Sequence, residues 1–84
     1  MEPGIICIPS AFKHGITVEN IRWALLHHLA DGSIEEADEN KYIAIGFGKS
    51  GNLLEIMYNH IDEQTVKVFH AVKCRKQLRE NLGI

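Results

Sequence analysis

The sequence predicts an α+β fold: an antiparallel sheet of four or five strands, with one helix packed on one face and a short C-terminal helix. Two observations lead to this expectation. Apolar residues recur every three to four positions between residues 17 and 29, as in an amphipathic helix. From residue 41 onward, apolar and polar residues alternate, as in strands with one buried face. The 84 residues suffice for one domain, so we expect a single domain over 1–84.

The chain begins with a short strand and the main helix. Residues 5–8 form an apolar run that Pro9 closes, which indicates an edge strand because proline cannot donate to a strand ladder. Thr17 is a good N-cap for the following helix, and Glu19 in the first turn favours the helix dipole. We expect this helix to end at Asp31-Gly32.

Strands and a short helix make up the rest of the chain. The expected elements are a weak strand at 33–37, a turn at 38–40, strong strands at 41–48, 53–60 and 65–72, and a helix at 73–82. The loop "GKSGN" between the first two strong strands offers two glycines for positive φ angles. A helix on one face leaves the other face of the sheet open to a partner or a substrate.

Charge is unevenly distributed. Residues 1–64 carry four Lys or Arg against ten Asp or Glu, a net charge of −6, whereas residues 65–84 carry five against one, a net charge of +4. Such a split indicates an anion-facing surface beside an acidic body, although a solvated helix face is the plain alternative.

Two side chains at strand positions are candidates for proton transfer. Glu55 has apolar neighbours in the middle of a strand, where burial would raise the pKa of a carboxyl group. An outward-facing Glu55 in solvent is the alternative. In the last strand we expect Val68, His70 and Val72 to share one face, and histidine is the side chain best suited to proton transfer near neutral pH.

Cations follow His70 directly. Lys73 and Arg75 could hold a phosphate beside this histidine, the arginine by a bidentate fork. The expected start of the last helix would add favourable potential for an anion. The alternative is a histidine at the end of the sheet beside a solubilising helix.

Several other chemistries find no support in the residues. No combination of histidines and cysteines has the spacing of a zinc site, and no glycine-rich phosphate loop lies between a strand and a helix, so we expect neither a metal nor a cofactor. Adjacent His27 and His28 point in different directions on a helix. Trp23 is either a half-buried core residue or an exposed anchor for a protein partner.

The two cysteines and the N-terminus bear on localisation. Cys7 and Cys74 do not form the dense cysteine framework of small secreted domains, and the sequence leaves open whether they meet. The N-terminal segment lacks a basic n-region, and its apolar run falls short of the about 20 residues of a membrane span. We therefore expect a cytoplasmic protein without a membrane partner.

The motifs "KHGIT", "KYIAIG", "GNLLEIMYN" and "VKVFHAVKCRKQL", at these separations, resemble the small BrnT-type toxins. These belong to the RelE-like ribonuclease toxins of bacterial toxin–antitoxin pairs. The pattern is similar to an actinobacterial-looking branch that reads roughly as Lys/Arg-His-Gly, Gly-Asn-Leu-Leu-Glu and His-Ala-x-x-x-Arg. The resemblance covers about residues 10 to 80 and implies a RelE/BrnT-like sheet flanked by helices.

The resemblance also implies an activity: metal-independent cleavage of messenger RNA by attack of a ribose 2′-hydroxyl on the adjacent phosphate, neutralised by a cognate antitoxin protein. This reaction needs a base, an acid and cations for the charge that develops on phosphorus. On the matching positions, Arg75 would hold the phosphate and His70 or Glu55 would be the base. Lys13 or His14 would supply the acid or a further phosphate contact.

Further cations, Lys73, Lys76 and Arg79, would bind the RNA backbone electrostatically. The chain departs from the pattern where it has "VKC", because many such toxins carry adjacent arginines there, and it is acidic overall. A second hypothesis is therefore a catalytically inactive binding module of the same fold, which forms a homodimer or binds an antitoxin-like protein. A neighbouring reading frame for a DNA-binding antitoxin would favour the toxin.

Overall fold

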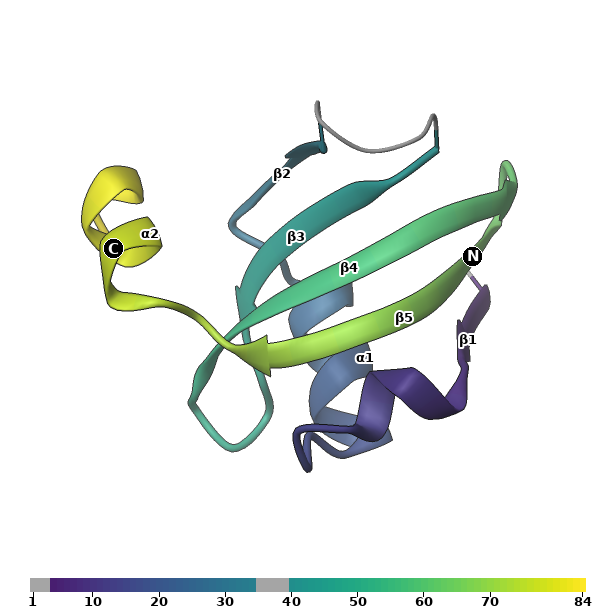
Figure 1. Ribbon diagram of the computed structural model, residues 1–84, viewed down its shortest axis with the longest axis horizontal. Coiled ribbons are helices and arrows are strands. Elements are labelled where there is room, and N and C mark those ends of the chain that lie inside the picture. Colours follow the sequence, from purple (N-terminus) through teal and green to yellow (C-terminus); the bar gives the residue numbers. More distant parts are fainter. Residues whose placement is uncertain (1–3, 35–39) are drawn as a thin grey trace.

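The computed structural model describes residues 4–34 and 40–84 and confirms the α+β fold class. Figure 1 shows the elements in chain order: β1 (Gly4–Cys7), the 3₁₀ helix η1 (Pro9–Phe12), α1 (Val18–Leu26), β2 (Ala30–Ser33), β3 (Tyr42–Phe47), β4 (Leu53–Asp62), β5 (Thr65–Lys73) and α2 (Lys76–Leu82). The five strands form one sheet in the order β1-β5-β4-β3-β2. All strand pairs are antiparallel except β1 with β5, so the sheet is mixed rather than wholly antiparallel.

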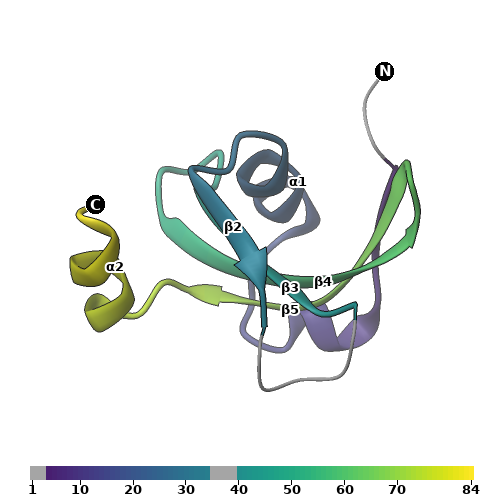
Figure 2. The same ribbon diagram turned by 90° about the horizontal axis from the view of Figure 1, so that it is seen from above.

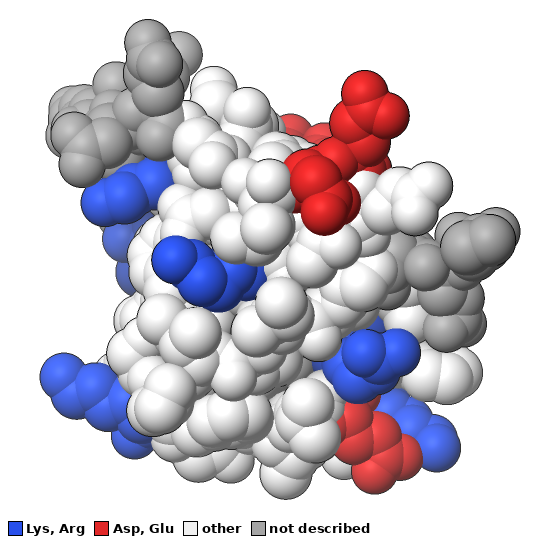
Figure 3. All heavy atoms as spheres, turned by 90° about the vertical axis from the view of Figure 1, so that its right-hand side faces the viewer, with Lys and Arg blue, Asp and Glu red and all other residues white. Residues whose placement is uncertain are grey.

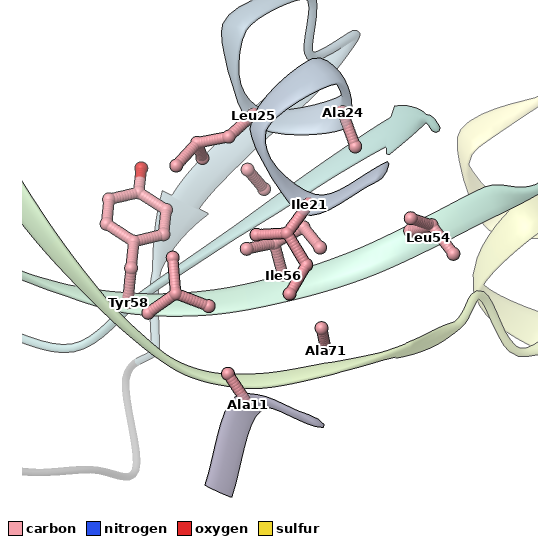
Figure 4. Close-up of a cluster of buried hydrophobic side chains, with 10 residues drawn as sticks. Ala11, Ile21, Ala24, Leu25, Leu54, Ile56, Tyr58 and Ala71 are labelled. Carbon is pink, nitrogen blue, oxygen red and sulfur yellow. The ribbon is translucent and has the colours of Figure 1, made fainter. Parts of the chain in front are cut away.

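Helix α1 covers one face of the sheet, which we call the core face. Seen from above, α1 lies on one side of the curved sheet, and α2 lies beyond its end (Figure 2). A buried apolar cluster joins α1 to the core face, and Ala11 of η1 reaches this cluster from the other side of β5 (Figure 4). The cluster consists of Ala11, Ile21, Ala24, Leu25, Ala44, Leu54, Ile56, Tyr58, Val68 and Ala71. This burial of apolar surface is the main favourable term that holds the domain together.

The ends of α1 are capped by side chains. As predicted, Thr17 is the N-cap, and its hydroxyl oxygen accepts a hydrogen bond from the Asn20 amide at 3.2 Å. The helix ends at Leu26, earlier than the predicted Asp31-Gly32, and strand β2 begins at Ala30. Nδ1 of His28 lies 2.8 Å from the Leu25 carbonyl oxygen and Nδ1 of His27 lies 3.0 Å from the Trp23 carbonyl oxygen. These two imidazoles therefore cap the last turn of the helix.

Two of the expected elements differ in extent. The weak strand at 33–37 and the turn at 38–40 lie mostly outside the described residues, and β2 occupies Ala30–Ser33 instead. Helix α2 starts at Lys76, not at residue 73, because β5 continues through Lys73 and Arg75 still has an extended backbone.

A β-bulge in β5 changes the faces of its side chains. Tyr58 pairs with Val68 and Met57 pairs with His70, so Phe69 has no partner on β4. Val68 and Ala71 therefore both enter the core, whereas His70 and Val72 lie on the opposite face of the sheet. The expectation that Val68 shares a face with His70 was wrong, because simple alternation does not anticipate a bulge. We call this opposite face the second face.

Candidate active site

Two histidines that are far apart in the sequence meet at the edge of β5. The rings of His14 and His70 pack edge to face, with their centroids 5.2 Å apart and their planes at 81°. His14 is exposed and His70 is half-buried. Two imidazoles at this separation can act as acid and base on one substrate, because each lies within reach of the same small group.

The parallel pairing of β1 with β5 explains why these histidines meet. Cys7 pairs with Val68, and the chain that leaves β1 continues in the same direction as β5. Pro9 cannot extend the ladder, and the chain turns into η1, which packs against β5. The Ser10 hydroxyl donates a hydrogen bond to the Phe69 carbonyl oxygen at 2.7 Å and fixes η1 beside the bulge. The residues after η1 therefore reach the edge of β5 at His70.

Lys73 lies on the opposite face of β5 from His70, because it pairs with the core residue Leu54. We call His14, His70 and Lys73 together the histidine site. His14 and Lys73 line a common hollow of about 200 Å³ between the N-terminus of α1, the β3–β4 loop and the end of β5. Ser50 and Asn52 of that loop also line the hollow. Lys13 is exposed and directly precedes His14. His14 thus links the two parts of the histidine site, because it lines the hollow with Lys73 and contacts the ring of His70.

A second pair of predicted residues forms a separate contact at the end of β5. The Glu55 side chain is only 2% exposed, and its Oε2 accepts hydrogen bonds from the backbone N–H of Arg75 at 2.8 Å and from Arg75 Nε at 3.1 Å. The Arg75 side chain is 71% exposed. Glu55 therefore faces neither solvent nor an open groove; it orients the guanidinium of Arg75 and holds the turn between β5 and α2.

Glu55 and His70 both lie on the second face, whereas Lys73 pairs with the core residue Leu54 and lies on the core face. Glu55 pairs with Val72, and His70 is two residues before Val72 on the same strand, so Glu55 and His70 are diagonal neighbours on one face. Cβ atoms in such diagonal positions are about 7 to 8 Å apart. The remaining predicted cations, Lys76 and Arg79, are exposed on α2.

The sequence predicted that Lys73 and Arg75 lie beside His70, and the structure divides this group. His70 contacts His14, Lys73 lies on the opposite face of β5, and Arg75 contacts Glu55. Nothing in the residue pattern indicated Ser50 and Asn52, because their place depends on the loop packing against α1. In the structure the Asn20 side-chain oxygen accepts a hydrogen bond from the Ser50 amide at 2.9 Å, which fixes the loop there.

The cysteines are separate free thiols. Burial raises the pKa of Cys7, partly offset by Arg22. Burial also raises the pKa of Cys74, and the Glu55 carboxylate adds to this effect while Arg79 and Arg75 oppose it. A raised pKa keeps a thiol protonated, so neither cysteine has the properties of an activated nucleophile.

Comparisons with known proteins do not extend this description. No model of a known protein family matches the chain, and no match was found among curated proteins or solved structures. Within residues 4–34 and 40–84, no three His, Cys, Asp or Glu side chains group in a way that could hold a metal ion. No helix in the described part of the chain has the length and apolar content of a membrane span.

Proposed function

We propose that this protein is a ribonuclease that cleaves RNA by attack of a 2′-hydroxyl on the adjacent phosphate, as in the RelE-like toxins that its motifs resemble. The observation that carries the proposal is the contact between His14 and His70, 5.2 Å between ring centroids, with Lys73 beside His14. Such a site holds an acid and a base within the space of one phosphodiester, with a cation beside His14.

The reaction assigns a role to each group. His70, in its neutral form, removes the proton from the ribose 2′-oxygen, which then bonds to phosphorus. His14, in its protonated form, gives a proton to the 5′-oxygen as its bond to phosphorus breaks. The products are a 2′,3′-cyclic phosphate and a 5′-hydroxyl. Lys73 stabilises the negative charge on the phosphate oxygens during the transfer.

Glu55 and Arg75 support binding rather than proton transfer in this scheme. Oε2 of Glu55 already accepts two hydrogen bonds, so the carboxylate is a positioning group for Arg75. The guanidinium, held at Nε, presents its terminal nitrogens to a neighbouring phosphate of the same strand. Lys13, Lys76 and Arg79 add electrostatic attraction for the RNA backbone.

Cleavage of a short RNA, followed by detection of the cyclic phosphate, tests this function. His14→Ala and His70→Ala should each reduce the rate by about 100-fold or more, the usual contribution of a general acid or base. His60→Gln is the matched control. His60 lies near the C-terminal end of β4, outside the histidine site, so this variant should retain the rate. An RNA with a 2′-deoxyribose at the cleaved position should stay intact.

Expression in bacteria tests the proposed role as a toxin. Growth should stop when the wild-type protein is produced alone and should recover when a cognate antitoxin is produced with it. A wild-type protein that leaves RNA intact and growth unaffected would overturn the enzyme. Capture of a protein partner or a homodimer under those conditions would support the inactive binding module instead.

A further inference from the structure

An apolar groove of about 390 Å³ separates α2 from the second face of the sheet. Its floor is formed by Ile43, Ile45 and Met57, its outer wall by Leu78 and Leu82, and Arg75 lies at its end. No polar side chain other than Arg75, Asp31 and Ser33 lines the groove among the described residues. The groove is therefore a hydrocarbon-lined space with a single cation.

Helix α2 does not close this groove. The helix has seven residues, none of them buried, and it lies away from the sheet at the end of the molecule (Figures 1 and 2). Leu78 is half-buried and Leu82 is 41% exposed. Two contacts hold the start of the helix in place. The Cys74 N–H donates a hydrogen bond to the Leu53 carbonyl oxygen at 2.9 Å, and Arg75 contacts Glu55. Two leucines thus face the sheet across space that an apolar group could fill with a gain in free energy.

The cation in the groove is oriented. Arg75 donates through Nε to the buried Glu55, and its terminal nitrogens have no protein partner among the described residues. The one acidic side chain at the groove, Asp31, already lies 3.4 Å from Nε2 of His28. An anion that enters the groove therefore meets a guanidinium fork that is anchored at Nε.

We propose that this groove binds a small amphipathic anion, a carboxylate on a medium-length hydrocarbon body. The carboxylate accepts hydrogen bonds from the terminal nitrogens of Arg75, and the hydrocarbon lies between the leucines of α2 and the floor residues. The size of the groove favours this occupant over a macromolecule. The groove volume is near the lower end of the range for small-molecule pockets, roughly 300 to 1,000 Å³. A peptide helix, about 10 Å in diameter, would have to displace α2 in order to enter the groove. The groove shares Arg75 with the proposed RNA contact, but binding of the small anion is measured without RNA and does not require cleavage.

Calorimetric titration of the full chain with sodium octanoate, below its micelle concentration, tests the proposal, with 1-octanol as the uncharged probe. We expect one octanoate to bind per chain, and octanol to bind roughly tenfold more weakly or worse because it lacks the charge-assisted hydrogen bonds. Methyl NMR signals of Ile43, Leu78 and Leu82 should shift on addition of octanoate. Equal affinities for octanoate and octanol would overturn the assignment of an anion.

Three variants separate the groove from other surfaces. Arg75→Gln should lower octanoate affinity to that of octanol, and Lys76→Gln, the next cation on the chain but outside the groove, should leave it unchanged. Since Arg75→Gln removes the partner of buried Glu55 and can unfold the protein, Ala30→Phe is the second test. Ala30 lines the groove, and a phenyl ring there should abolish binding while the contact between Glu55 and Arg75 stays intact.

Three results would overturn the site: no saturable binding of octanoate, unchanged binding by the folded Ala30→Phe variant, or shifts at residues away from the groove. Binding to vesicles of anionic phospholipid without binding of free octanoate would identify a membrane contact and would also overturn it.

Discussion

The buried carboxylate of Glu55 fixes the path of the chain at the end of β5. Its neighbours Leu54 and Ile56 enter the core, so its own side chain is directed to the second face, where the end of β5 covers it. A buried carboxylate is costly unless it is hydrogen-bonded. One oxygen accepts both the backbone and the side-chain N–H of Arg75, which satisfies this need and fixes the chain where it leaves the sheet.

Replacing Glu55 by glutamine should therefore destabilise the protein. The amide cannot provide the charged acceptor for both Arg75 donors, and we expect the free energy of unfolding to fall by about 1 to 3 kcal/mol. Urea denaturation measures this change. Glu80→Gln on exposed α2 is the matched control and should change stability by less than about 0.5 kcal/mol. Equal effects of the two substitutions would show that the contact with Arg75 contributes little.

The contribution of Tyr58 to stability depends on pH in the alkaline range. Burial raises the pKa of its phenol, and the charges of Asp31 and Tyr42 raise this pKa further. The unfolded chain has the ordinary tyrosine pKa of about 10, so above this pH it loses a proton that the folded protein keeps. The contribution of Tyr58 to stability is thus fully present below pH ~10 and is lost as the pH rises through the higher pKa of the folded state.

Tyr58→Phe should consequently reduce the loss of stability above pH ~10, because phenylalanine does not titrate. Chemical denaturation of both proteins at a series of pH values from neutral to alkaline gives the comparison. Parallel curves of unfolding free energy against pH would mean that the phenol does not stabilise the folded state through its raised pKa.

At the scale of elements, the contact between α1 and the sheet depends on a glycine in β3. A Cβ atom on Gly46 would lie against the Ala24 carbonyl oxygen, closer than real Cβ atoms come, and 3.0 Å from the Cα of His28. Both atoms belong to the backbone and cannot rotate away. Glycine at this position therefore sets how closely α1 approaches the core face.

Gly46→Ala should accordingly destabilise the protein by about 1 to 3 kcal/mol through overpacking. Gly32 in the neighbouring strand β2 is a matched control, since nothing lies within 4 Å of a Cβ placed there and its φ is not positive. Thermal unfolding of Gly32→Ala should be close to that of the wild type. A Gly46→Ala protein as stable as Gly32→Ala would contradict the close approach of α1.

Acidic residues of the β4–β5 hairpin and basic residues of α2 lie at opposite ends of the molecule. The exposed acidic residues Asp62 and Glu63 lie at the β4–β5 hairpin, and α2 with its cations lies at the opposite end (Figure 1). The face at the hairpin end shows acidic side chains at the top and a further acidic side chain among basic ones at the lower right (Figure 3). A nucleic acid would therefore be drawn toward the end of β5 and α2 rather than to the hairpin.

If RNA binds at that end, its affinity should depend on salt through the cations there. Lys76→Gln and Arg79→Gln should each reduce the slope of log affinity against log salt concentration by about 0.7, the value for one phosphate contact with a single strand. Lys49→Gln is the control, because Lys49 pairs with Glu19 at 2.8 Å on α1. Fluorescence anisotropy of a labelled RNA at several salt concentrations measures these slopes. Slopes that do not change in any variant would place the RNA elsewhere.

The sequence by itself determined the fold class, the N-cap at Thr17, the three long strands and the burial of one face of β4, because these depend on local patterns of apolar residues and capping groups. It also marked His14, Glu55, His70 and Arg75 as candidates. Only the tertiary structure decided how these four pair. The parallel alignment of β1 with β5 and the bulge at Phe69 bring His14 to His70, and the end of β5 brings Arg75 to Glu55. Long-range strand register sets such contacts, and no local pattern in the chain encodes it.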